Sequence, residues 1–257
     1  MQLSVRSPSS GLIIEKYFLI ILLSFLFSSC KKEHLFDCFK GSGKTITVER
    51  QVSYFNKIDT YNDVNLALHS GATGSVKVTG GANIIDGITV SVENNTLTIR
   101  NENKCNWARD FKNKFTVDVW VDSLNLLTNN GSGNITFEDT LFTYAFQYEN
   151  WNASGSVKLK FNGDRISVNV HTGSADLTVS GIAGIDFLYH NGYGYMNFKD
   201  LKTRITYITN QNSGDCKINV RDEMLAQIKY IGNIYYSGNP SNLITRITGT
   251  GQLIHEQ

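Results

Sequence analysis

Three side chains that could bind a ligand together recur at one position of a repeating pattern. Trp151, His171 and His190 each lie six residues before an apolar residue that follows a turn of small residues. In a stack of parallel strands about 4.8 Å apart, such residues would form one outward column. An indole packs on sugar rings and imidazoles donate hydrogen bonds or bind metals, so the column predicts a ligand site. A partly exposed structural ladder is the alternative.

The carboxylates show no comparable convergence. Cleavage of a polysaccharide would need clustered carboxylates, or a basic residue beside a calcium site, on one face. The candidate acids fall mainly in returns between strands or alternate with core residues: Asp118, Asp122, Asp139, Asp164 and Asp200. The sequence has no His-Glu-x-x-His motif, phosphate-binding loop or calcium-binding nonapeptide repeat. We therefore expect a protein that is not an enzyme and that uses no cofactor or metal.

The N-terminus has the features of an export signal. Arg6 and Lys16 precede an uncharged apolar run over residues 17–27, which is shorter than the roughly 20 residues that span a bilayer. Ser28, Ser29 and Cys30 then resemble a bacterial lipobox, in which the cysteine receives diacylglycerol with acyl chains such as palmitate. This predicts lipidation at Cys30 and a membrane contact through the lipid. An ordinary secretory signal that happens to end near a cysteine is the alternative.

The remaining cysteines have two expected roles. Cys216 occupies an apolar column of the repeat, which predicts a buried free thiol. Cys38 and Cys105 lie outside that column, in a compartment that we expect to be oxidising, and they are the candidate disulfide pair. Lys31 follows the lipidation candidate, with no Asp at the position that signals inner-membrane retention in some bacteria. We therefore expect an outer-membrane lipoprotein, on the periplasmic or the cell-surface face.

Composition limits both the fold and the partners. The 257 residues include 24 Lys and Arg against 23 Asp and Glu, which gives no electrostatic argument for a nucleic-acid partner. Two prolines, 22 glycines and many Asn, Thr, Ser, Val and Ile are typical of short strands joined by glycine turns.

The second half of the chain repeats with a period of about 20 residues. An apolar anchor follows each turn at successive spacings of 22, 20, 19, 20 and 18 residues: Ile135, Val157, Leu177, Met196, Cys216 and Ile234. Glycine or alanine stands two residues before every anchor, where we expect a sharp bend or a positive φ angle. An apolar or aromatic residue stands two residues after it, on the same side of a strand.

A second apolar pair precedes most of the turns: Leu124 with Leu126, Phe146 with Tyr148, Ile166 with Val168, Ile185 with Phe187, and Ile205 with Tyr207. Each unit therefore contains strand, corner, strand and return, and it can bury its apolar face only by stacking on its neighbours. The period is too short for propeller blades and lacks the leucine-rich consensus. We predict an all-β protein built as a parallel β-solenoid, with an antiparallel sandwich as the competing fold.

The chain divides into four expected parts. These are a signal peptide over residues 1–29, a lipidated tether over 30–44, N-terminal β-rich coils over 45–104 and regular solenoid repeats over 105–257. The Asn-rich and charged stretch 101–114 marks the internal boundary. Whether residues 45–104 form additional coils or a separate β-rich segment stays open at this point.

Several segments resemble the putative auto-transporter adhesin family with the head GIN domain, whose members are exported lipoproteins. The resemblance is carried by residues 38–43 (CFKGSG), 50–58 (RQVSYFNKI), 64–71, 88–99 and 124–135. It implies a right-handed parallel β-helix and brings no catalytic residues. We therefore expect a lipid-anchored, non-catalytic envelope protein for adhesion or scaffolding, with a glycan or extracellular protein as ligand. A polysaccharide-active β-helix enzyme, a lyase or a glycosidase, is the alternative.

Overall fold

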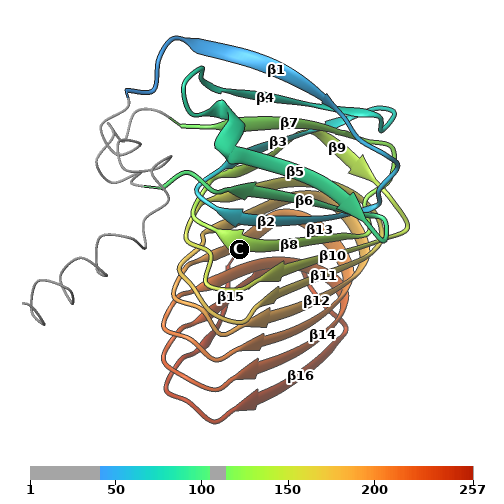
Figure 1. The fold of residues 1–257 in the computed structure, drawn as a ribbon. Coiled ribbons are helices and arrows are strands. Elements are labelled where there is room, and N and C mark those ends of the chain that lie inside the picture. The colour runs from blue at the N-terminus through green and yellow to red at the C-terminus, as the bar shows by residue number, and fades with distance from the viewer. Residues whose placement is uncertain (1–40, 105–113, 257) are drawn as a thin grey trace, which may run out of the picture.

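A computed structural model describes residues 41–104 and 114–256, which form one stack of β-coils (Figure 1). A single 3-10 turn, η3 (Ile85–Gly87), interrupts the strands in this part of the chain. The strands are β1 (Thr45–Gln51), β2 (Lys57–Asn62), β3 (Asn65–Ser70), β4 (Ser75–Gly81), β5 (Ile88–Glu93), β6 (Thr96–Asn101), β7 (Thr116–Val121), β8 (Leu126–Gly131), β9 (Ile135–Phe142), β10 (Ala145–Asn150), β11 (Val157–Val170), β12 (Leu177–His190), β13 (Met196–Asn210), β14 (Cys216–Ile228), β15 (Ile234–Ser237), β16 (Asn242–Ile247) and β17 (Leu253–His255).

The predicted parallel β-solenoid with coils of about 20 residues is confirmed. Two parallel ladders run along the stack, and the long strands β11 to β14 bend so that each contributes to both ladders. One ladder contains β6, β2, β8 and β10, the second halves of β11 to β14, and β16. The other contains β7, β3 and β9, the first halves of β11 to β14, then β15 and β17.

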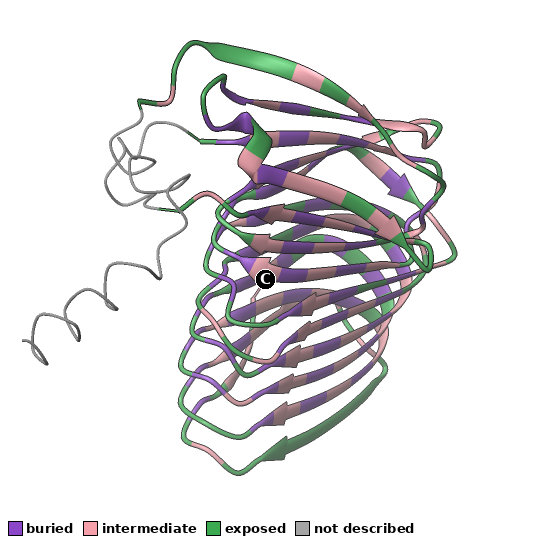
Figure 2. Cartoon of the chain, in the orientation of Figure 1, coloured by how far each residue is buried: buried purple, intermediate pink, exposed green. Residues whose placement is uncertain are grey.

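The anchor residues form the predicted core column. Val157 pairs with Ile135 and Leu177, and the ladder continues through Met196 and Cys216 to Ile234. All six side chains are buried, and purple positions alternate with pink and green ones along the strands in Figure 2. The structure extends this column at both ends, because Leu66 pairs with Ile135 and Leu253 pairs with Ile234.

The glycines beside the anchors have a different cause from the one expected. None of them has a positive φ angle. Instead, the next coil approaches so closely that a Cβ on Gly155 would lie 2.0 Å from the Gly133 carbonyl oxygen, and one on Gly214 would lie 2.1 Å from the Gly194 oxygen. Glycine is therefore required by the contact between coils, and the bend itself does not require it.

The inward column of the second strand differs from the prediction in three coils. In β8 the core residue is Leu127, and the predicted Leu126 is half-buried on the outer side. The buried residues are Asp186 and Leu188 in β12, and Thr206 and Ile208 in β13, so the pairs Ile185 with Phe187 and Ile205 with Tyr207 face outward. The corner is seven residues from Val170 to Leu177 but six from His190 to Met196. The prediction counted a fixed number of residues back from each anchor. Where the corner is one residue shorter, this count is wrong by one residue, and it assigns the outward side chains of the strand to the core.

Residues 45–104 contribute both a coil and a cap. The β2–β3 coil stacks in parallel on β8 and β9, and β6 and β7 stack on its other side. Beyond them, β4 pairs antiparallel with β7, β1 with β4 and β5 with β6. Strands from before and after the 101–114 boundary therefore belong to one solenoid, and antiparallel strands close its N-terminal end (Figure 1).

At the opposite end of the stack, no strand within residues 41–104 and 114–256 covers the outer side of β16. Every residue of β16 is exposed, although Leu243 and Ile247 continue the inward column of Met224 and Ile228. The structure describes no helix that has both the length and the apolar composition needed to cross a bilayer.

Candidate ligand-binding face

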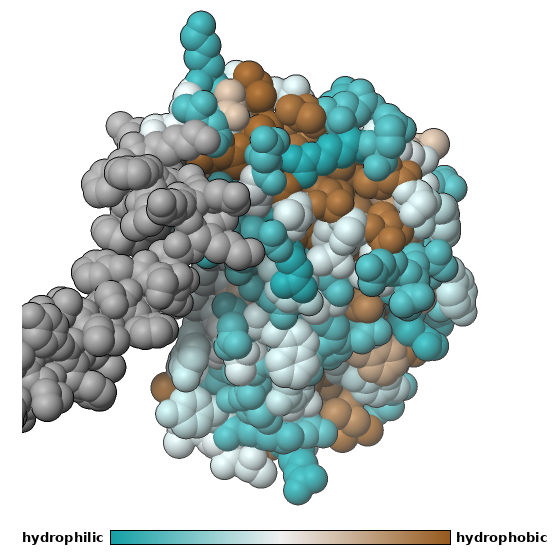
Figure 3. All heavy atoms as spheres, in the orientation of Figure 1, coloured by the Kyte–Doolittle hydropathy of each residue, from teal (hydrophilic) through white to brown (hydrophobic). Residues whose placement is uncertain are grey.

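The outer surface of the first ladder combines aromatic, amide and hydroxyl side chains. We call this surface the polar-aromatic face. Its members lie on β10 to β13 or directly after β10, β11 and β13. They are Gln147, Glu149, Trp151, Ser167, Asn169, His171, Phe187, Tyr189, Tyr207 and Gln211. Alternation along each strand directs these side chains outward while their neighbours fill the core. Figure 3 views this side of the stack, and the surface over the regular coils is mainly hydrophilic to neutral.

Trp151 and His171 form the centre of this face. Their ring centroids lie 3.8 Å apart and their planes differ by 10°. Trp151 is 45% exposed, which is unusual for a tryptophan that a fold uses only for packing. His171 covers one face of the indole, so the edge and the opposite face remain for a ligand.

A carboxylate fixes the imidazole. The Nε2 atom of His171 lies 2.6 Å from Glu149 Oε2, and the amide of Asn169 donates to Glu149 Oε1 at 2.7 Å. Gln147 donates to the same Oε1 atom. Glu149 is thus a shared acceptor for side chains from two coils, and it holds the imidazole in the orientation that stacks on Trp151.

Further rings continue the face toward the C-terminus. Tyr189 lies 5.8 Å from His171, and the Gln211 amide donates to its hydroxyl at 2.9 Å. Phe187 and Tyr207 stack with their centroids 5.3 Å apart. The Tyr207 hydroxyl donates to Glu223 at 3.0 Å, and this bond and the nearby negative charge raise the pKa of Tyr207.

His190 is not part of this face, contrary to the expected column of three. It pairs with Val170 and Asn210, inside the solenoid, and is fully buried. The residue beside His171 on the surface is Asn191, whose backbone N–H donates to the Val170 carbonyl. The corner after His190 is one residue shorter than the corner after His171. A residue six positions before the anchor Met196 therefore faces the core and not the surface.

Comparison with known proteins assigns this solenoid to a family. A model of the family described as "Putative auto-transporter adhesin, head GIN domain" matches residues 54–240. The chain belongs to this family. No curated protein matches it.

Solved structures share the fold of this adhesin-family chain. A "putative adhesin" from Bacteroides fragilis NCTC 9343 is 24% identical with a TM-score of 0.77, over 83% of this chain and 97% of that one. A "putative lipid binding protein" from Parabacteroides distasonis ATCC 8503 is 20% identical with a TM-score of 0.63, over 84% and 98%. A "putative adhesin" from the same organism is 19% identical with a TM-score of 0.61, over 84% and 98%.

The adhesin-family chain contains a cysteine and a histidine side by side in its core. Cys216 Sγ lies 3.3 Å from His190 Nδ1, and the Asn212 amide lies 2.7 Å from His190 Nε2. Cys216 is a buried free thiol, as predicted. Burial raises the pKa of the Cys216 thiol and lowers the pKa of His190 to about 4. Both groups are therefore neutral and enclosed, and they lack the thiolate that a cysteine nucleophile requires.

Two of the expected acids, Asp118 and Asp139, have partners in the solenoid wall. Asp118 lies 2.9 Å from His69 Nε2, and Asp139 accepts the backbone N–H of Ser70 at 2.9 Å. Within residues 41–104 and 114–256, no group of three or more His, Cys, Asp or Glu side chains could hold a metal ion. Asp118 and Asp139 therefore orient neighbouring groups of the solenoid wall.

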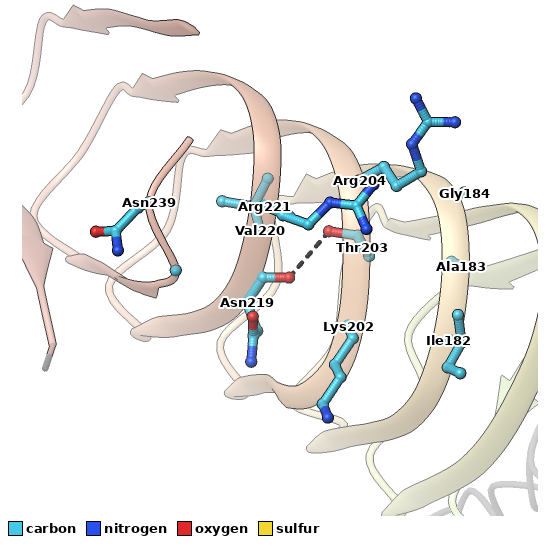
Figure 4. A pocket seen from close by; sticks show the side chains of 11 residues that line it. Ile182, Ala183, Gly184, Lys202, Thr203, Arg204, Asn219, Val220, Arg221 and Asn239 are labelled. Carbon is cyan, nitrogen blue, oxygen red and sulfur yellow. Dashed lines mark hydrogen bonds between the residues drawn. The ribbon is translucent and has the colours of Figure 1, made fainter. Parts of the chain in front are cut away.

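A hollow of about 590 Å³ lies where β12, β13 and β14 bend (Figure 4). Its lining contains Lys202, Arg204 and Arg221 but no carboxylate, and the Thr203 hydroxyl donates to the Asn219 carbonyl at 3.0 Å. Without a carboxylate or histidine in the lining, this hollow lacks the acid and base of a glycosidase.

Sequence reasoning missed a second stack of the same kind. His69 and Trp120 lie 4.9 Å apart at an angle of 19°, and Asp118 holds His69 as Glu149 holds His171. In both places an acid stands two residues before the tryptophan, a spacing that could have been recognised. Lys77 lies 5.1 Å from the Trp120 ring and Gly71 packs against its edge, so this indole is less accessible than Trp151.

The lipidation candidate Cys30 and the disulfide candidates Cys38 and Cys105 lie outside the described residues.

Proposed function

We propose that this chain is a non-catalytic, lipid-anchored binding protein of the cell envelope that attaches to glycans through the polar-aromatic face. One observation carries the proposal: Trp151 is 45% exposed and stacks on an imidazole that Glu149 holds in place. An exposed indole in a fixed orientation packs on the C–H faces of sugars, and the surrounding amides and hydroxyls match sugar hydroxyls as donors and acceptors.

The surroundings of this stack support a ligand of that kind. A second hollow of about 510 Å³ opens on the same face, lined by Gln147, Arg165 and Ser167 among others. Most core positions of the coils hold apolar side chains, so most of the polar and aromatic side chains that could contact a ligand lie on the outer surface. The adhesin names of the family and of two structural relatives agree with a binding role.

A binding screen with three variants tests the proposal. Purified protein is applied to an array of glycans and to extracellular-matrix proteins, with Trp151→Ala, His171→Ala and the control Tyr195→Ala. Tyr195 is 59% exposed and lies outside the face, so it controls for loss of an exposed ring. We expect both face variants to lose glycan binding by about tenfold or more while the control keeps it. Binding to a matrix protein alone, or release of reducing sugar from a polysaccharide, would contradict the proposal.

We further propose that Cys30 carries the lipid and becomes the first residue of the mature protein. The apolar run over residues 17–27 and the Ser28-Ser29-Cys30 sequence support this assignment. Metabolic labelling with a fatty-acid analogue should mark the wild-type protein and leave Cys30→Ala unmarked, and label on the variant would contradict it. Membrane fractionation followed by protease treatment of whole cells tests the expected outer-membrane location and the face that carries the protein.

A further inference from the structure

The outward column that contains Trp151 continues through the coils on both sides. Strand register places Arg100 opposite Tyr61 and Tyr61 opposite Asn130. Trp151 comes next, because its backbone N–H donates to Asn129 and its neighbour Asn150 pairs with that residue. The column therefore crosses β6, β2, β8, β10 and β11, the first four of which lie one below another in Figure 1, in the order Arg100, Tyr61, Asn130, Trp151 and His171.

Two aromatic rings flank Asn130, and each has a partner on its far side. The Arg100 guanidinium lies 3.6 Å from the Tyr61 ring centroid, and the His171 ring lies 3.8 Å from that of Trp151. Both partners stand on the side away from Asn130. The two ring faces that remain uncovered by these partners are therefore the ones directed toward Asn130.

The residue between the rings is short. Asn130 is half-buried, and its amide ends much nearer the backbone than the phenol of Tyr61 or the indole of Trp151 does. Two steps of about 4.8 Å separate the strands that carry the rings, so the backbones of these strands lie about 9.6 Å apart. Because van der Waals contacts between ring layers need about 3.5–4 Å each, rings that project side by side from strands at this spacing leave room for one further layer and not two.

We propose that a single neutral pyranose ring inserts between Tyr61 and Trp151, with Asn130 as the floor of the site. The aromatic faces would contact the C–H surfaces of the sugar, and the amide would donate to one sugar hydroxyl and accept from another. Arg100 and His171 hold the two rings from behind, so little side-chain freedom is lost on binding. The inference rests on the proposed glycan binding and assigns its position, using Tyr61, Asn130 and Arg100 in addition to the stack.

A pair of matched substitutions tests this position. Asn130→Phe would fill the space between the rings, and the added ring would continue the aromatic column. Asn191→Phe adds the same ring in the same column beside His171, outside the proposed site. Both variants are compared with wild type in far-UV circular dichroism and thermal melting. Binding is then measured on the glycan array and by titration with the methyl glycosides of glucose, galactose, mannose and N-acetylglucosamine, following the Trp151 indole N–H by NMR.

We expect Asn130→Phe to lose glycan binding by about tenfold or more and Asn191→Phe to stay within about twofold of wild type. Tyr61→Ala should lose binding as well, while Tyr195→Ala should retain it. If Trp151→Ala loses binding but Asn130→Phe and Tyr61→Ala do not, the proposal that a sugar ring inserts between Tyr61 and Trp151 is wrong. The proposal that the polar-aromatic face binds glycans is then retained. If wild type binds no glycan and no methyl glycoside shifts the indole signal, the proposed function and this inference are both wrong.

Discussion

Trp151 and His171 lie 20 residues apart in the chain, and their rings are parallel with centroids 3.8 Å apart. The contact exists because one full coil separates them, so that the coil length places one side chain directly over the other. An aromatic pair of this geometry contributes about 0.5–1.5 kcal/mol beyond its buried area.

A double-mutant cycle measures this contact. We expect Trp151→Ala and His171→Ala to be non-additive, with a coupling of about 0.5–1.5 kcal/mol in the free energy of unfolding from urea titration. Trp151→Ala combined with His69→Ala is the matched control, because His69 stacks on a different tryptophan. Equal coupling in the two cycles would show that the Trp151–His171 stack has no energetic role.

The glycine column predicts a strong dependence on one methyl group. Gly214→Ala would place a Cβ 2.1 Å from the Gly194 carbonyl oxygen, so the two coils must separate. We expect a loss of about 1–3 kcal/mol or more in the free energy of unfolding. Gly74→Ala is the control, since nothing lies within 4 Å of its Cβ, and it should change stability by less than about 0.5 kcal/mol. Similar unfolding midpoints for the two variants would contradict the close-contact explanation.

Asp186 predicts how stability depends on pH. This carboxyl is fully buried, its Oδ1 atom has no hydrogen-bond partner, and burial raises its pKa from 3.8 to about 7. The folded state therefore favours the neutral acid, and the stabilisation present below pH 3.8 is lost as the pH rises toward 7. We expect Asp186→Asn to remove this loss. At pH 8 its free energy of unfolding, measured by urea titration, should exceed that of wild type by roughly 1–3 kcal/mol.

His190 acts in the opposite direction over an overlapping range. Burial lowers its pKa from 6.5 to about 4, so its neutral form stabilises the fold above pH 6.5 and that stabilisation is lost as the pH falls toward 4. In Asp186→Asn the His190 dependence is no longer offset. The variant should therefore gain stability as the pH rises from 4 to 6.5. A flat profile in urea titrations across this range would contradict the assignment.

Cys216 provides a chemical measure of core burial. Because burial raises the pKa of its thiol and encloses the sulfur, iodoacetamide should modify Cys216 on the order of 100-fold or more slowly in the native protein than in urea. Peptide mapping by mass spectrometry follows this residue separately from the other cysteines. Rapid labelling under native conditions, or a disulfide at Cys216, would contradict the position of Cys216 in the anchor column.

Much of the fold could be predicted from the sequence because its core repeats in register. Each anchor from Ile135 to Ile234 begins a strand in which the second residue after the anchor faces the same way as the anchor. Counting forward from each turn therefore identifies buried positions such as Phe198 and Ile218. Trp151 and His171 could be paired in the same way, since the corners that follow them have equal length. Local periodicity decides these features.

Only the tertiary structure decided whether the His190 side chain lies in the core or on the surface. Its corner is one residue shorter, and a shift of one residue along a strand moves a side chain from the surface to the core. Tertiary structure alone also placed Tyr61 and Trp151 on either side of Asn130. The reason is that β2 lies between β6 and β8, although β2 precedes both strands in the chain. A repeat determines which residues face inward where the corner length is constant, whereas the stacking order of its coils depends on contacts between segments far apart in sequence.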